Sequence, residues 1–164
     1  LWMEYGLYDK VTRNRMNAQT AKQILHYLPG MWKITRDIYT QIDASSYHSN
    51  GYGTFTESED ELNVLFYSEK VIALNNGLAS SIGTKKYKYK YDITTHSISK
   101  YFTDDRLFYQ LNILEHKASG EHLCAQDLYI ANYIFEDDQF RLTYLATGPL
   151  KHYEIVTQYS KIES

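Results

Sequence analysis

In the stretch KKYKYKYD, residues 85–92, lysine and tyrosine alternate without interruption from Lys86 to Tyr91. Successive side chains of a β-strand point to opposite faces, so this pattern puts the tyrosines on one face and the lysines on the other. The tyrosine face contains Tyr87, Tyr89 and Tyr91, and the lysine face contains Lys86, Lys88 and Lys90. The pattern predicts a strand with an aromatic face toward a protein interior and a basic face toward solvent.

On both sides of this stretch, segments rich in aromatic and β-branched residues are separated by turn residues. The expected strands lie within residues 30–39, 51–57, 61–74, 97–113, 121–147 and 152–162. Two of these segments are hairpins, with turns at 103–105 and 137–138. We expect a kink near Ser68 and a loop or wide turn over 75–83. About nine short antiparallel strands in succession predict a mainly β barrel or sandwich.

One helix precedes the strands. Asn17 is a plausible cap, and Ala21, Ile24, Leu25 and Leu28 then recur at helical spacing. Pro29 and Gly30 end the pattern, which predicts a helix of about three turns over Ala18–Leu28. We expect residues 1–16 to be an N-terminal extension and 17–164 to be one domain.

The composition narrows the function classes. The net charge of -3 gives no long-range attraction to nucleic acid. A single cysteine cannot form an internal disulfide, and no segment approaches the length of a membrane span. We therefore expect a cytoplasmic protein that has no nucleic-acid partner and no membrane span. Aromatic residues make up 15% of the chain, which favours a packed core and an aromatic cavity.

The segment EHLCAQDLY, residues 121–129, contains the candidates for chemistry: His122, Cys124, Asp127 and Tyr129. In one straight strand, His122 and Cys124 would face away from Asp127 and Tyr129. A bulge near Ala125–Gln126 would bring all four side chains to one face.

These candidates have several interpretations. His122 and Asp127 could form an acid–base pair assisted by Cys124 or Tyr129. Cys124 could instead be a nucleophile activated by His152 or Lys151, or simply a small core residue. A metal site would need His116 or His152 in addition, but no strong zinc spacing is present, so we predict no metal. The sequence identifies no cofactor.

Aromatic and polar residues on other segments could line the interior of a barrel. The alternation in 85–92 separates lysines from tyrosines, whereas a nucleic-acid platform needs both on one face. The predicted ligand-binding residues are Trp32, Arg36, Tyr87, Tyr89, Tyr91, Arg106, Tyr109 (or Phe108), His122, Asp127, Tyr129, Lys151 and Tyr153. The bland interpretation puts Asp104, Asp105 and Arg106 in a hairpin turn, and Lys151 and His152 in a solvated loop.

The order of a helix followed by Gly30-Met31-Trp32 at the start of the first strand resembles the Gly-x-Trp entry of lipocalin-type barrels. In lipocalins this tryptophan packs at the closed end of the barrel, often under an arginine from the last strands. Here no arginine follows Arg141. The resemblance implies a lipocalin-like antiparallel β-barrel.

A more specific resemblance runs from Leu28 to Tyr159. The motifs LPGMWKITRDI, GYGTF, LFYSEK, YKYKYD, YFTDDRLFY, HLCAQDLY and TGPLKHY are similar to those of domain of unknown function family 6314. Asp104-Asp105-Arg106 stands where that family usually has Asp-Gly-Arg. His152 stands where its late motif usually has aspartate. The resemblance implies the barrel and no established activity.

Three functions follow from these patterns. The first is binding of a small apolar or aromatic molecule inside the barrel, oriented by polar groups. The second is an enzyme that acts on such a molecule through His122 and Asp127. The third is a barrel filled by its own side chains whose outer surface binds another protein, which predicts an exposed apolar patch and no cavity.

Overall fold

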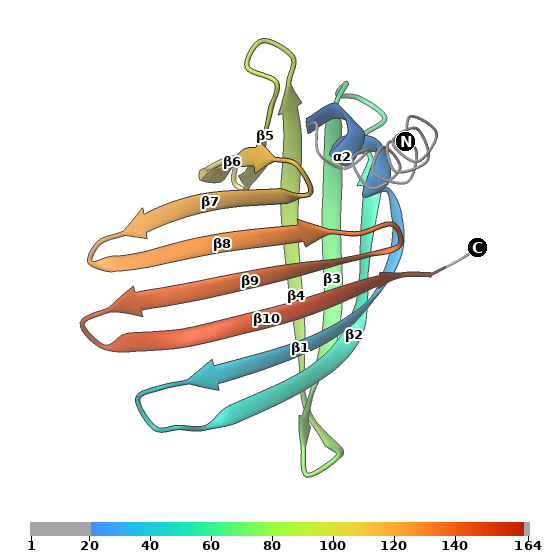
Figure 1. Cartoon of the computed structure of the whole chain (residues 1–164). Coiled ribbons are helices and arrows are strands. Elements are labelled where there is room, and N and C mark those ends of the chain that lie inside the picture. Colours follow the sequence, from blue (N-terminus) through green and yellow to red (C-terminus); the bar gives the residue numbers. More distant parts are fainter. Residues whose placement is uncertain (1–20, 163–164) are drawn as a thin grey trace, which may run out of the picture.

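The computed structural model describes residues 21–162, which form a closed antiparallel barrel of ten strands and a short helix (Figure 1). Each strand pairs with its neighbours in sequence, and β1 closes the barrel by pairing with β10. The elements are α2 (Ala21–Tyr27), β1 (Gly30–Thr40), β2 (Ser46–Glu57), β3 (Val64–Asn75), β4 (Leu78–Asp92), β5 (Ser97–Tyr101), β6 (Leu107–Leu114), β7 (Lys117–Cys124), β8 (Asp127–Phe135), β9 (Gln139–Gly148) and β10 (Lys151–Lys161). The predicted lipocalin-like barrel is confirmed, with one strand more than the expected nine.

The helix covers one end of the barrel. It covers residues 21–27 of the predicted helix, and the predicted cap Asn17 lies outside the described residues, as do residues 18–20 and the extension over 1–16. Ala21, Ile24 and Leu25 are buried, so the predicted apolar stripe does pack against the barrel. Neither this helix nor any other part of residues 21–162 offers a helix long and apolar enough to cross a membrane.

Trp32 lies beneath the helix at this closed end. It is fully buried, its indole donates a hydrogen bond of 2.8 Å to the Leu28 carbonyl, and its ring meets Phe140 edge-on. The Lys161 amino group lies 5.2 Å from the Trp32 ring and donates to the Tyr27 carbonyl. Because Lys161 is paired with Trp32 across β10 and β1, a lysine occupies the place where lipocalins often have an arginine.

Below this end, the interior is filled with rings that cross from one wall to the other. Tyr89, Tyr109 and Tyr133 are all buried, and the Tyr109 ring fits because Gly120 in β7 has no side chain that would meet it. The opposite end carries the turns that join β1 to β2, β7 to β8 and β9 to β10, which lie together on the left of Figure 1. The barrel therefore has a packed closed end and a mouth formed by these hairpins.

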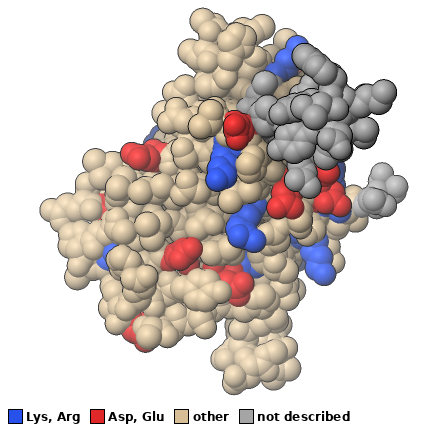
Figure 2. Space-filling model, viewed as in Figure 1, with Lys and Arg blue, Asp and Glu red and all other residues tan. Residues whose placement is uncertain are grey.

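Several local predictions are corrected by the structure. Residues 78–83 are not a loop, because β4 already begins at Leu78 after a turn at Asn76–Gly77. The irregularity of β3 lies between Ala73 and Leu74, where its register with β4 shifts, and not near Ser68. On the outside, basic and acidic side chains are interspersed on the visible face (Figure 2).

The most consequential correction is at Ala125–Gln126. The expected bulge in one long strand is instead a tight hairpin turn between β7 and β8. Ala125 adopts a left-handed backbone conformation there, with a φ of 56°. Neither residue belongs to the usual turn formers, which is why the sequence pattern favoured a continuous strand.

Candidate functional site

A chamber of about 310 Å³ opens at the mouth of the barrel, and we call it the outer chamber. That volume is at the lower end of the range for small-molecule pockets, roughly 300–1,000 Å³. Its walls are largely aromatic, and they come from β4, from β6 to β10 and from the turn between β5 and β6. The lining residues are Lys85, Tyr87, Phe102, Phe108, His122, Cys124, Tyr129, Tyr144, Tyr153 and Ile155. Side chains therefore leave the mouth end of the interior open, while rings fill the part nearer the helix.

The hairpin of β7 and β8 places three residues of the predicted cluster, His122, Cys124 and Tyr129, in the lining of this chamber, whereas Asp127 does not line it. His122 is directly opposite Tyr129, and Cys124 is directly opposite Asp127. Directly opposed residues of an antiparallel pair point to the same face, so all four side chains share one face. The predicted juxtaposition is thus present, although a turn and not a bulge produces it.

Within this cluster, His122 and Asp127 have separate partners. A His122 ring nitrogen lies 2.8 Å from the Phe108 carbonyl, and the ring meets the Phe108 ring edge-on. The Asp127 carboxylate lies 3.2 Å from the Lys151 amino group, which also donates to the Tyr129 hydroxyl at 3.1 Å. In the part of the chain that the structure describes, no hydrogen bond or ion pair joins His122 to Asp127.

These contacts change the acidity of Lys151. Its hydrogen bonds to Tyr129 and Asp127, in that order of effect, raise the pKa of the Lys151 amino group. Lys151 therefore stays charged and connects β10 with two side chains of β8. It does not lie in a solvated loop, because it begins β10.

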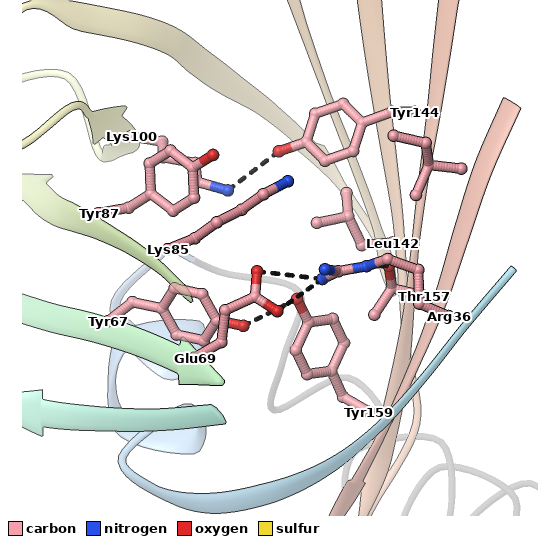
Figure 3. Close-up of a pocket in the computed structure, with 11 residues that line it drawn as sticks. Arg36, Tyr67, Glu69, Lys85, Tyr87, Lys100, Leu142, Tyr144, Thr157 and Tyr159 are labelled. Carbon is pink, nitrogen blue, oxygen red and sulfur yellow. Dashed lines mark hydrogen bonds and ion pairs between the residues drawn. The ribbon is translucent and has the colours of Figure 1, made fainter. Parts of the chain in front are cut away.

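A second, much smaller cavity of about 20 Å³ adjoins the outer chamber on its inner side. The two share Lys85, Tyr87, Tyr144 and Ile155 as lining residues. At the bottom of this inner cavity, the Arg36 guanidinium donates to both carboxylate oxygens of Glu69, at 2.8 and 3.1 Å (Figure 3). Arg36 also donates to the Thr157 hydroxyl at 2.9 Å, so the buried ion pair is anchored on three strands.

Lys100 is the most deeply buried amine among the described residues, with 2% of its surface exposed. Its amino group donates to the Tyr144 hydroxyl at 2.9 Å and lies 4.0 Å from the centre of the Tyr87 ring. Burial lowers the pKa of this amino group well below the usual range of lysine. The aromatic faces around it compensate only part of the lost hydration.

The Tyr144 hydroxyl continues into a chain of buried phenols. It bonds to Tyr109 at 2.7 Å, Tyr109 bonds to Tyr133, and Tyr133 bonds to Tyr89 at 3.2 Å. Burial raises the pKa of each of these hydroxyls, so all four remain neutral donors and acceptors. This row of hydrogen-bonded phenols fixes the position of Tyr144, the hydrogen-bond partner of Lys100, and makes the floor of the site rigid.

The remaining predicted residues lie elsewhere. Trp32 belongs to the closed end, and Tyr91 bonds to His96 beyond the cavities. Arg106 is exposed and pairs with Asp104 in the hairpin turn, as the bland interpretation expected. Tyr89 and Tyr109 support the floor through the phenol chain, whereas Arg36, Tyr87 and Tyr153 do line a cavity.

Three charged residues of the inner cavity were not among the predicted site residues: Glu69, Lys85 and Lys100. Each lies two positions along its strand from an aromatic or apolar residue that faces inward, so its own side chain faces the same way. Glu69 follows Tyr67 by two positions, Lys85 precedes Tyr87 by two, and Lys100 follows Ile98 by two. A charged residue at a position where strand alternation predicts an inward-facing side chain was the signal that could have identified them.

The model of the family of unknown function DUF6314 matches residues 28–161. The chain belongs to this family. The resemblance found in its sequence motifs is therefore confirmed. No curated protein matches the sequence.

Among solved structures, the DUF6314 chain is similar to that of the S-type phycobiliprotein lyase CPES from Guillardia theta. The TM-score is 0.71, and the match covers 91% of this chain and 96% of the other at 8% sequence identity. At that identity the similarity shows a shared barrel fold.

Proposed function

We propose that this DUF6314 protein binds a small, planar aromatic or apolar molecule in the outer chamber. The observation that most supports this proposal is the chamber of about 310 Å³, which has aromatic walls above a rigid floor of buried charges. Phe108 and Tyr144 have nearly parallel rings whose centroids are 6.0 Å apart, and Phe102 stacks on Phe108. Such rings favour a flat ligand, because offset stacking adds to the burial of apolar surface.

The contacts of His122 and Asp127 favour binding over acid–base catalysis. Asp127 is engaged by Lys151 and His122 by a backbone carbonyl, so neither activates the other. Tyr153 and Tyr129 add hydroxyl groups at the rim that can orient a ligand. The fold shared with a phycobiliprotein lyase supports a barrel scaffold for this role and leaves the ligand open.

The test is a fluorescence titration with N-phenyl-1-naphthylamine, an uncharged aromatic probe that brightens in apolar surroundings. We expect saturable binding with one probe per chain. Phe108→Ala should weaken binding roughly fivefold, since one aromatic contact contributes about 1 kcal/mol. The matched control is Tyr52→Ala on the outer face of β2, where Tyr52 is exposed. Absence of saturable binding, or equal affinity of the two variants, would contradict the proposal.

A further inference from the structure

The inner cavity has more basic than acidic groups. Among the described residues that line it, Arg36, Lys85 and Lys100 are basic and Glu69 alone is acidic. Both oxygens of the Glu69 carboxylate accept from Arg36, so this acid is committed to one of the three basic side chains. Within residues 21–162, neither lysine side chain has a carboxylate partner in an ion pair, and for Lys100, which is buried, such a partner is what protein interiors normally provide.

Lys85 shows this imbalance most directly. It is paired in register with Glu69 across β4 and β3, yet its side chain forms no ion pair or hydrogen bond in the described part of the chain. The Lys85 side chain is exposed overall at the rim, while its amino group points inward toward the Tyr144 hydroxyl (Figure 3). Removal of this amino group from water and the nearby Arg36 charge lower the pKa of Lys85.

Lys100 approaches the same space from β5. Its single hydrogen bond goes to the Tyr144 hydroxyl, and its other neighbours are aromatic rings, of which Tyr87 is the nearest. The Lys85 and Lys100 amino groups both line the inner cavity, and the Tyr144 hydroxyl accepts a hydrogen bond from Lys100. We call these two amino groups the donor cluster. This donor cluster lies at the boundary between the inner cavity and the outer chamber, since Lys85 and Tyr144 line both.

We propose that the ligand carries an anionic group, a carboxylate or sulfonate, which binds between Lys85 and Lys100 while its aromatic part lies in the outer chamber. This inference rests on the proposed function and names the class of molecule: an aromatic acid. The anion would accept charge-assisted hydrogen bonds from both lysines, which are about twice as strong as neutral ones. A ligand with a positive group would add to the unpaired positive charge of the site and is excluded by the same electrostatics.

The experiment compares two probes that share one ring system. 8-Anilinonaphthalene-1-sulfonate carries a sulfonate, and N-phenyl-1-naphthylamine lacks it. We expect the sulfonate probe to bind roughly tenfold more tightly to the wild-type protein, because a charge-assisted hydrogen bond contributes at least that factor. Lys85→Gln should lower the affinity for the sulfonate probe and bring the ratio of the two affinities toward one.

Lys86→Gln is the matched control. Lys86 is the next residue of β4 and is exposed on the outer face, so the same change in net charge should leave both affinities unchanged. Lys100→Met provides a second test from the other side of the donor cluster and should also lower the affinity for the sulfonate. A thermal melt of each variant confirms that the barrel is folded during the titration.

The outcomes separate this inference from the proposed function. If the uncharged probe binds and the sulfonate gives no advantage, the anionic subsite is overturned and the aromatic chamber stands. An advantage that Lys85→Gln and Lys86→Gln reduce equally also overturns it, because the effect then comes from net charge. If neither probe binds, the proposed function fails together with this inference.

Discussion

Glu69 and Lys85 are opposite each other on β3 and β4, yet the Glu69 carboxylate bonds to Arg36 on β1 and leaves Lys85 unpaired. The carboxylate thus bridges the interior of the barrel and does not neutralise its nearest lysine in the register. Because Glu69 bonds to Arg36, the inner cavity has a buried ion pair at its bottom and the amino group of Lys85, without a carboxylate partner, above it.

The first prediction concerns the buried ion pair. Arg36→Met should lower the free energy of unfolding by about 3–5 kcal/mol, because it leaves the Glu69 carboxylate buried without its partner. The double variant with Glu69→Met should recover most of this loss, since no charge then remains uncompensated. Urea denaturation of both variants measures the difference. A double variant no more stable than Arg36→Met would show that the ion pair is not the cause.

The second prediction concerns Lys100, whose folded-state pKa is depressed by burial. The Lys100 amine binds a proton more readily in the unfolded chain than in the folded one. Its burial therefore lowers the free energy of unfolding, and this destabilisation is fully present at any pH below the pKa of Lys100 in the folded protein. The cost disappears as the pH rises through the unfolded pKa of about 10.4. Lys100→Met should therefore stabilise the barrel at neutral pH, by about 1–3 kcal/mol.

The check is thermal denaturation of wild type and Lys100→Met across a pH series. The advantage of the variant should shrink toward pH ~10. Ionisation of tyrosines in the unfolded chain affects both proteins equally and cancels in the comparison. A constant difference between the two proteins over the whole series would show that burial of the amine imposes no titratable cost.

A third prediction concerns the space that the phenol chain needs. A methyl group at Gly120 would lie 2.6 Å from the Tyr109 ring, whereas one at Gly83 would be 3.6 Å from its nearest neighbour, Val71. Gly120→Ala should destabilise the barrel by about 1–3 kcal/mol through overpacking. Gly83→Ala, its control within the same sheet, should be tolerated. Equal midpoints of denaturation for the two variants would refute the packing described here.

The barrel could be predicted from sequence because its strands alternate clearly. Strand alternation correctly predicted that the tyrosines of β4 face inward, and the Gly-x-Trp motif correctly predicted that the first strand starts near Trp32. The turn at Ala125–Gln126 could not be predicted in the same way, because neither residue favours a turn and their conformation is imposed by the pairing of β7 with β8.

The charged floor was missed for a different reason. Burial of a lysine or glutamate is unfavourable unless the fold provides partners, and partners from distant strands are invisible in a local pattern. Arg36 was among the predicted ligand-binding residues, and it lies on the same strand face as the buried Trp32 and Ile34. Glu69 and Lys100 are likewise at inward-facing positions of their strands, but their hydrogen-bond partners lie on distant strands of the barrel.

The most direct test of binding inside the chamber uses Cys124, the one cysteine of the chain, which is exposed and lines the outer chamber. The rate at which N-ethylmaleimide alkylates Cys124 should be measured with increasing N-phenyl-1-naphthylamine. If the probe occupies the chamber, alkylation will slow severalfold, with the same concentration dependence as the fluorescence increase. If the rate is unchanged when the fluorescence is saturated, the probe binds elsewhere and the chamber is not the binding site.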